Sequence, residues 1–449
     1  MAGAVRMFAV VLCFQVAVMS MPAPVAAANV AGRATADASL LAEIDRLASQ
    51  VQEQMVGWRR DLHEHPELSN REVRTAGLVA DHLRKLGLDV RTQVAHTGVI
   101  GVLRGGRPGP VVALRADMDA LPVTEETGLL FASKVRADYN GEQVGVMHAC
   151  GHDVHTAILM AVAQVLAQRH EQLPGTVVFL FQPAEEGAPK GEQGGAELMI
   201  REGALENPKP AAIFGLHVSP KYHAGTIAYR SGPTMASSDS FRIVVRGRQT
   251  HGAQPWSGVD PIVTACQIVL GLQTIVSRQT DLTDSPAVVT VGSIRGGVRS
   301  NIIPDEVQML GTIRCFLPQM RADLHQRVRT TATMIAQAAG AVAEVTIGDG
   351  NPVTFNDPNL AARMVPTLQA VAGKDRVLIT PLVTGAEDFS FYEQQVPGLY
   401  FFLGVTPADA DPGQAPACHS PHFCADESAM TLGVRALAHL ALARLQEPQ

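Results

Sequence analysis

Two short segments carry side chains that together can bind metal and accept a proton. One is the run 148–154, which contains Cys150 and His152, and the other is the pair Glu185 and Glu186. Thiolate, imidazole and carboxylate groups are ligands for a Lewis-acidic divalent ion, and an adjacent second carboxylate can take a proton from bound water. Each segment alone is commonplace, since a cysteine often serves as a small buried apolar residue. In combination they predict metal-assisted hydrolysis.

Apolar runs that we expect to be buried strands precede these segments. The runs are 111–115, 177–181 and 212–216, with a helix expected from about residue 156 to 169. This alternation predicts an α/β sheet covered on both faces. The polar residues that follow the runs are Asp117 and Asp119, then Glu185 and Glu186, then His217. Because ligand groups gather at the carboxyl ends of strands in such sheets, we expect one site at this edge.

The middle of the chain has a different order of expected strands and helices. Strand, helix, strand, strand, helix and strand are expected at 241–246, 261–278, 288–294, 307–314, 321–339 and 343–347. This order is the ferredoxin-like pattern. The sequence therefore predicts an inserted α+β lid domain at 237–349, between two parts of a doubly wound catalytic domain at 40–236 and 350–449.

The amino terminus has the pattern of an export signal. Arg6 is followed by the apolar stretch 7–19 and by small residues at 24–28. We expect residues 1–28 to be a cleaved signal peptide, so that the protein is periplasmic or secreted without stable membrane insertion.

Length and composition indicate the class of protein and limit the kinds of molecule that it is expected to bind. The chain has 449 residues, 46% of them hydrophobic and 18% charged, with a formal net charge of −7. These values are typical of a packed globular protein of two or three domains. Since no basic run with interleaved aromatics is present, we do not expect nucleic acid as a partner.

Six motifs occur in the order seen in M20 peptidases, and the chain resembles the amidohydrolase branch of that family. The motifs are Arg115–Pro122, His148–Asp153, Gln182–Gly187, Gly215–Val218, Gly385–Phe389 and His419–Pro421. The resemblance covers nearly all of the chain after the leader. It implies a two-metal catalytic domain with a lid, and hydrolysis of the amide bond between an acyl group and an amino acid.

The resemblance also implies roles for individual residues. The expected metal ligands are Cys150 as the bridging thiolate, His152, Glu186, His217 and His419. Glu185 is expected to be the general base outside the coordination shell. Asp117 stands where most relatives outside this branch have histidine, and we expect Asp117 and Asp119 to orient the ligands. In the lid, His251 and Asn301 are expected to reach the substrate and its oxyanion, and Arg314 to pair with the substrate carboxylate.

Several alternatives stay open at this stage. The two divalent ions are zinc or manganese, with cobalt or nickel possible. The substrate is a small N-acyl amino acid or a short peptide, so the enzyme could instead be a dipeptidase or a metallocarboxypeptidase. A noncatalytic metal-dependent binding protein is a third reading, which Glu185 disfavours. A homodimer through the lid is possible.

Other residues receive simpler expectations. His63, Glu64 and His65 look like a metal cluster but are expected only to end a helix before Pro66. Cys266 is expected to be a core residue. In an oxidising compartment, Cys418 and Cys424 are predicted to form a disulfide around His419.

Overall fold

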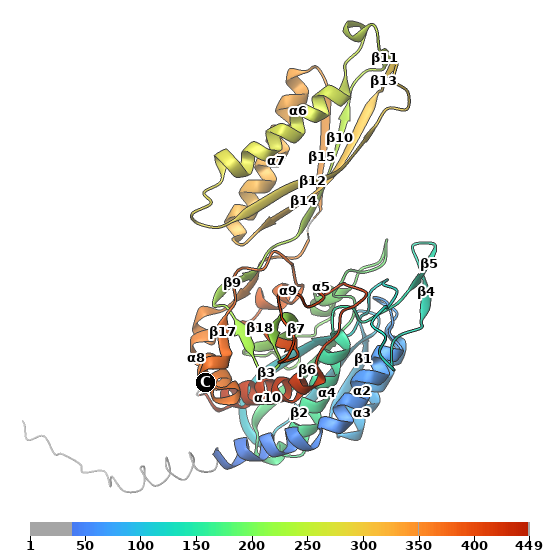
Figure 1. The fold of residues 1–449 in the computed structure, drawn as a ribbon. Coiled ribbons are helices and arrows are strands. Elements are labelled where there is room, and N and C mark those ends of the chain that lie inside the picture. Colours follow the sequence, from blue (N-terminus) through green and yellow to red (C-terminus); the bar gives the residue numbers. More distant parts are fainter. Residues whose placement is uncertain (1–37, 349, 448–449) are drawn as a thin grey trace, which may run out of the picture. The chain divides into compact units, whose positions relative to one another are not determined.

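The computed structural model describes residues 38–348 and 350–447, and the chain divides into two units, residues 1–43 and 44–449. The described part of the first unit, residues 38–43, is helical. The predicted signal peptide lies outside the described residues. Everything below concerns the second unit (Figure 1).

A mixed sheet of eight strands carries the residues that follow the apolar runs. The strand order is β1-β2-β6-β3-β7-β18-β8-β17. The strands are β1 (Asp89–Val94), β2 (Gly98–Arg104), β3 (Arg107–Asp117), β6 (Pro174–Gln182), β7 (Ile213–His223), β8 (Ile227–Tyr229), β17 (Val377–Ile379) and β18 (Gly398–Thr406). Strands β6, β3, β7 and β18 are parallel. They are apolar along most of their length because helices cover both of their faces.

Two pairs of helices cover this sheet. Helices α4 and α10 pack on one face, and α5 and α9 pack on the other. The helices of this part are α2 (Gln52–Glu64), α3 (Val73–Lys85), α4 (His152–Ala167), α5 (Gly195–Arg201), α8 (Pro358–Ala372), α9 (Phe389–Glu393) and α10 (Met430–Gln446). The predicted α/β fold is confirmed. Helix α2 is directly preceded by a turn at Val51.

Short pairings complete this part of the molecule. They are β4 (Arg136–Tyr139) with β5 (Glu142–Gly145), and β9 (Gly232–Met235) with β16 (Thr354–Asn356). Short helical turns lie at His170–Gln172, Lys374–Arg376 and Glu427–Ala429.

A second, four-stranded antiparallel sheet spans the region predicted to be the lid. Its order is β12-β14-β10-β15, as the ferredoxin-like pattern requires. The elements are β10 (Asp239–Arg246), β11 (Thr250–His251), α6 (Pro261–Thr274), β12 (Ala287–Gly296), β13 (Ile302–Ile303), β14 (Glu306–Cys315), α7 (Pro318–Ala338) and β15 (Val342–Gly348), with a turn at Pro255–Ser257. The sheet shares an apolar core of its own with α6 and α7. The exact domain boundaries stay a prediction.

Helix α6 illustrates how local sequence starts an element. The side chain of Asp260 accepts hydrogen bonds from the backbone N–H groups of Ile262 and Val263, and Pro261 occupies the first turn, where no N–H is needed. With the π-helical segment Ile275–Gln279, this helix is long and apolar enough to cross a membrane by composition alone. However, its buried face packs in the core of the second sheet. The prediction for Cys266 is wrong, because this helix residue is exposed.

Candidate metal centre

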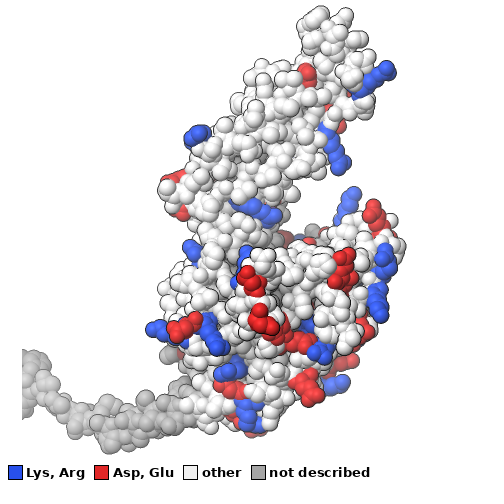
Figure 2. All heavy atoms as spheres, viewed as in Figure 1, with Lys and Arg blue, Asp and Glu red and all other residues white. Residues whose placement is uncertain are grey.

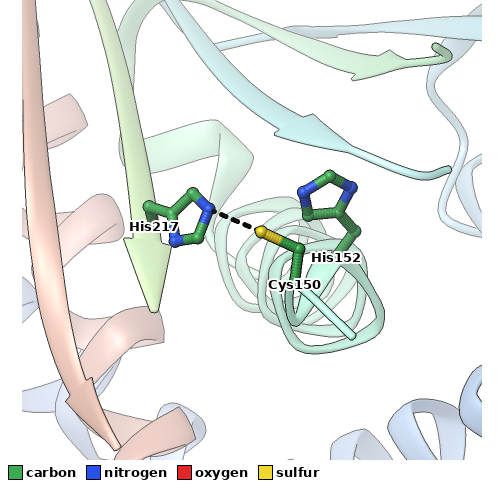
Figure 3. Close-up of side chains that lie close together, drawn as sticks. All are labelled: Cys150, His152 and His217. Carbon is green, nitrogen blue, oxygen red and sulfur yellow. Dashed lines mark hydrogen bonds between the residues drawn. The ribbon is translucent and has the colours of Figure 1, made fainter. Parts of the chain in front are cut away.

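Three predicted ligands converge where the central strands end. The Sγ atom of Cys150 lies 3.3 Å from Nε2 of His217, and Figure 3 shows both side chains beside His152. Cys150 precedes α4, His152 is the first residue of α4, and His217 lies on β7. One potential ligand atom from each residue lies within 4.8 Å of the other two. The arrangement suits a thiolate and two imidazoles around one ion.

Gly151 permits the tight turn between the first two ligands. Its φ is +84°, a conformation that side chains rarely adopt, and an added Cβ would lie 2.3 Å from Cγ2 of Val218. Glycine therefore allows Cys150 and His152 to face the same site from the amino terminus of α4.

The contacts of His152 leave one ring nitrogen for a metal. Its Nδ1 lies 2.9 Å from the carbonyl oxygen of Asp119 and 3.3 Å from the Oδ1 atom of that residue. These two acceptors place the proton on Nδ1. Its Nε2 is buried and has no hydrogen-bond partner. A buried nitrogen with a free lone pair costs free energy unless it is bound, so the residues present fit a metal ion.

Glu186 and His419 complete the predicted ligand set. Oε1 of Glu186 lies 2.9 Å from Nε2 of His419. The same oxygen has no correctly oriented hydrogen bond. The oxygen of Glu186 and the nitrogen of His419 lie close together without hydrogen-bond geometry, an arrangement that fits two ligands of one cation. The Sγ atom of Cys150 lies within 4.8 Å of both atoms. Cys150 thus belongs to two candidate groups, one with His217 and one with His419, as the bridging role requires.

Glu185 lies next to these ligands in a site crowded with carboxylates. Its Oε2 is 3.9 Å from Nε2 of His152. Burial raises the pKa of Glu185 well above its ordinary value, and the negative charges of Glu387 and Glu186 raise it further. A carboxyl group whose proton affinity is increased in this way is suited to take up and release a proton.

Asp119 holds both glutamates by their backbones. Its two carboxylate oxygens accept hydrogen bonds from the N–H groups of Glu185 and Glu186, each at 3.1 Å. Ser69 donates a further hydrogen bond to Asp119 at 2.7 Å. With its contact to His152, Asp119 connects Glu185, the two predicted ligands His152 and Glu186, and the strand end. This position agrees with the orienting role expected for it.

Asp117 orients a different part of the site. Its Oδ1 lies 2.6 Å from Nδ1 of His155, and Nε2 of His155 accepts a hydrogen bond from the N–H of Val218. Val218 in turn offers its carbonyl oxygen to Nδ1 of His217 at 2.6 Å. This leaves Nε2 of His217 facing the site. His155 thus supports a ligand and is not itself one of the predicted five.

Arg115 is a supporting residue that the sequence reasoning missed. Its guanidinium is fully buried and contacts the carboxylates of Asp117, Glu387 and Asp388 at 2.6–3.0 Å. Although burial opposes ionisation, these carboxylates keep the pKa of Arg115 well above its ordinary value. An arginine inside an apolar strand run was the available signal, because a buried cation needs charged partners. Glu387 and Asp388 therefore brace the site through Arg115.

Glu72 was also missed, although it lies at the start of α3. One of its oxygens accepts hydrogen bonds from the N–H of Asn70 at 3.0 Å and from the N–H of Ala184 at 2.9 Å, and the other accepts from the hydroxyl of Thr97. Ala184 has a φ of +53°, which is unfavourable for a residue with a Cβ. Glu72 thus stabilises the strained residue that directly precedes Glu185.

His63 and His65 are not brought together as a metal cluster. His63 is buried between Asp153, at 2.8 Å, and Glu125, at 3.1 Å. His65 is exposed and contacts its own helix through the carbonyl of Asp61. The expectation that they do not ligate metal stays a prediction, and the buried ion pair of His63 was not foreseen.

The predicted disulfide between Cys418 and Cys424 is wrong, because both cysteines are free. Cys418 instead contacts the thiol of Cys150, and this contact lowers the pKa of Cys418 to about 6. The reason is the backbone path: the N–H of His419 donates to the carbonyl of Ala149 at 2.7 Å, which directs Cys418 toward the metal centre.

The lid residues form a separate group. His251 on β11 pairs with Ile302 on β13, and the N–H of Gly252 donates to the carbonyl of Asn301 at 2.8 Å. His251 and Asn301 are therefore neighbours, and both are exposed. Arg314 lies half-buried on β14, where burial lowers its pKa. Their expected substrate contacts stay predictions.

Comparison with known proteins identifies the family. Residues 113–443 match the model of peptidase family M20/M25/M40, and the chain belongs to this family. It is thus a hydrolase of amide bonds, as expected from the sequence.

Individual relatives cover almost the same length. The chain is 40% identical to thermostable carboxypeptidase 2 of Saccharolobus solfataricus, over 90% of this chain and 98% of that protein. It is 38% identical to the N-acetyl-L-cysteine deacetylase of Bacillus subtilis, over 85% of this chain and 86% of that protein. A crystal structure of the Bacillus subtilis YXEP protein, a dinuclear metal-binding peptidase of the M20 family, has a TM-score of 0.74 at 36% identity and covers 89% of this chain and 99% of that one.

Proposed function

We propose that this protein is an exported amidohydrolase that releases an amino acid from an N-acyl amino acid. The observation that carries the proposal is the position of Glu185, which lies beside the ligands His152 and Glu186 while its backbone is held by Asp119. A protein that only bound metal would not need a buried carboxylate of raised pKa at this point. The deacetylase similarity supports the choice of substrate class.

The proposed ligands are Cys150, His152, Glu186, His217 and His419, with zinc as the preferred metal because of the thiolate. Metal ions held by these residues would polarise the substrate carbonyl and make a bound water more acidic. Glu185 then accepts a proton from the attacking water and delivers it to the leaving nitrogen. Asp119 keeps the backbone of Glu185 in position during both transfers. His251 and Asn301 are proposed to stabilise the oxyanion, and Arg314 to bind the substrate carboxylate.

A cavity beside Glu186 is a candidate for the acyl group. Its volume is about 150 Å³, and its wall is mixed, with Leu68 and Leu121 beside the charged residues Arg71 and Asp138.

A carboxypeptidase is the second candidate, favoured by the similarity to thermostable carboxypeptidase 2. Both reactions cleave an amide bond next to an amino acid with a free carboxylate, so they differ in what lies on the acyl side. A screen of metal-reconstituted protein should include N-acetyl, N-benzoyl and longer acyl amino acids, dipeptides and blocked peptides. Preferred cleavage of acyl amino acids supports the proposal, and preferred cleavage of peptides supports the second candidate.

We also propose a homodimer through the lid. Strand β12 is an edge of the second sheet and exposes Val288 and Ile294, and α6 exposes Leu270. An open strand edge with apolar neighbours is suited to pair with a second copy. Light scattering of the purified protein measures this directly, and a monomer at micromolar concentration contradicts it.

A further inference from the structure

Helix α2 carries none of the five predicted ligands, yet one of its side chains contacts two segments that do. Arg59 is 1% exposed, and its Nε atom lies 2.8 Å from Oδ2 of Asp153, the residue after His152 on α4. Its Nη1 atom donates a hydrogen bond to Oε1 of Glu427 at 3.2 Å. Glu427 and His419 both belong to the connection from β18 to α10. Because a buried cation needs charged partners, Arg59 joins this connection to the start of α4.

His63, one helical turn further along α2, makes a second link between the same two segments. Its ring lies 2.8 Å from the carboxylate of Asp153 and 3.1 Å from that of Glu125. The backbone N–H of the residue after Glu125 donates to the carbonyl of Pro421 at 2.9 Å. Pro421 lies close to His419 in the chain. The buried face of α2 thus contacts the His419 segment by a second, indirect route.

The position of His419 depends on contacts of this kind. Its side chain is 54% exposed, and its φ is +70°, a conformation that is unfavourable for a residue with a Cβ. A residue in this conformation keeps it only where the surrounding structure holds it. Its own backbone N–H donates to the carbonyl of Ala149, and the chain that follows it is held by α2 through Glu427.

We propose that Arg59 is a positioning residue for the metal centre. It holds the connection that carries His419 against the start of α4, and so raises the affinity for the ion bound by Cys150, Glu186 and His419. These three ligands form one of the candidate metal groups. A cation that contacts a carboxylate on each segment keeps the distance between the segments fixed, which pre-organises His419 for the ion. The inference rests on the proposed ligands, and it predicts metal affinity and not the choice of substrate.

Zinc titration of the full-length protein against a chelator of known affinity tests this, with the melting temperature of the metal-free protein measured beside it. Arg59→Met removes the charge and keeps much of the side-chain volume. We expect it to weaken binding of one of the two zinc equivalents by about tenfold or more and to leave the other nearly unchanged. Arg59→Lys can keep one of the two ion pairs and should recover part of the loss. Parental affinity for both equivalents in Arg59→Met would overturn the proposal.

Arg60 provides a matched control at the next position of α2. It contacts the same carboxylate of Glu427 at 2.6 Å, but its side chain is 51% exposed. Arg60→Met should therefore change zinc affinity by no more than roughly twofold. An equal loss in Arg60→Met would overturn the role of the buried contact between Arg59 and Asp153.

Glu427→Gln tests the same link from its other end, where the side chain is 20% exposed and the fold is less at risk. It should weaken the same zinc equivalent, and the double variant Arg59→Met/Glu427→Gln should bind zinc no more weakly than Arg59→Met alone. Additive losses, or a lower melting temperature with both equivalents kept, would show that Arg59 supports only the fold.

His419→Ala separates this inference from the proposed ligands. We expect it to lose one zinc equivalent. If it does so while Arg59→Met keeps both, only the positioning role fails. If His419→Ala also keeps both, the proposed ligand set is wrong, and the inference falls with it.

Discussion

At the scale of single residues, Glu185 has the most specific role. Replacing it with glutamine keeps the shape of the side chain and the hydrogen bond that its backbone N–H donates to Asp119, but removes the proton acceptor. We expect Glu185→Gln to retain metal and to lower kcat by about two to four orders of magnitude. Elemental analysis and steady-state kinetics on the same preparation check this. Full metal content with parental kcat would remove Glu185 as the base.

His63 gives the stability of the protein a predictable dependence on pH. Burial opposes its charge, but the carboxylates of Asp153 and Glu125 outweigh burial and raise the pKa of His63 to about 9. Since the ordinary value is 6.5, the ion pair stabilises the fold fully below pH 6.5, and this contribution is lost as pH rises through about 9. The shift corresponds to about 3 kcal/mol at most.

Urea unfolding across this pH range measures the effect. His63→Gln should be less stable than the parent at the acidic end and should lose the decline in stability toward alkaline pH. His422→Gln serves as the control, because His422 is largely exposed. An equal slope in the parent and in His63→Gln would show that another group causes the dependence.

At the scale of elements, the turn before Glu185 depends on the start of α3. Glu72→Ala would leave the buried N–H groups of Asn70 and Ala184 without an acceptor, which costs about 1–3 kcal/mol for each. Because Ala184 would then relax from its unfavourable φ, we expect kcat to fall more than KM changes. Kinetics of Glu72→Ala and Glu72→Gln test this, with Glu53→Ala on the exposed face of α2 as control. Partial rescue by glutamine is expected, and equal effects in Glu53→Ala would contradict the role.

The sequence predicts the helices and strands better than it predicts the buried residues that hold the site in position. The strands, the ferredoxin-like order and the convergence of Cys150, His152 and His217 follow from periodicity and from motifs. Glu72 and Arg115 were missed because their partners lie far away along the chain and no local pattern marks a buried hydrogen bond. Cys418 was paired with Cys424 because the two are near in sequence, whereas the backbone bond of His419 to Ala149 decides the actual neighbour.

At the scale of the whole molecule, His251 and Asn301 lie at the short β11–β13 pair in the region of the second sheet, whereas the predicted metal ligands belong to the part of the chain that forms the first sheet and its helices. We expect His251→Ala to keep its metal but to lose about two orders of magnitude in kcat/KM, as for loss of an oxyanion donor. Mixing this variant with Glu185→Gln protein locates the action of His251. Recovered activity after subunit exchange shows service to the partner subunit, and no recovery after proven exchange shows service within one chain. Parental kcat/KM in His251→Ala would rule out the role.

Acidic and basic side chains are not separated into two regions on the face of the molecule that Figure 2 shows. On the face shown in Figure 2, acidic and basic side chains are interspersed over the larger sheet and its helices. A small substrate that approaches this face meets no field of a single sign, so specificity must come from contacts at the site.

The order of strands also sets the order in which the protein can be completed during synthesis. Strand β18, at Gly398–Thr406, lies between β7 and β8 in the sheet. Both of these strands come much earlier in the chain. Until the ribosome has made this last inner strand, the edge of β7 has no partner and His419 does not yet exist. A nascent chain thus carries an open apolar edge and an incomplete centre almost to its end. The proposed export would then carry a chain whose metal centre is still incomplete.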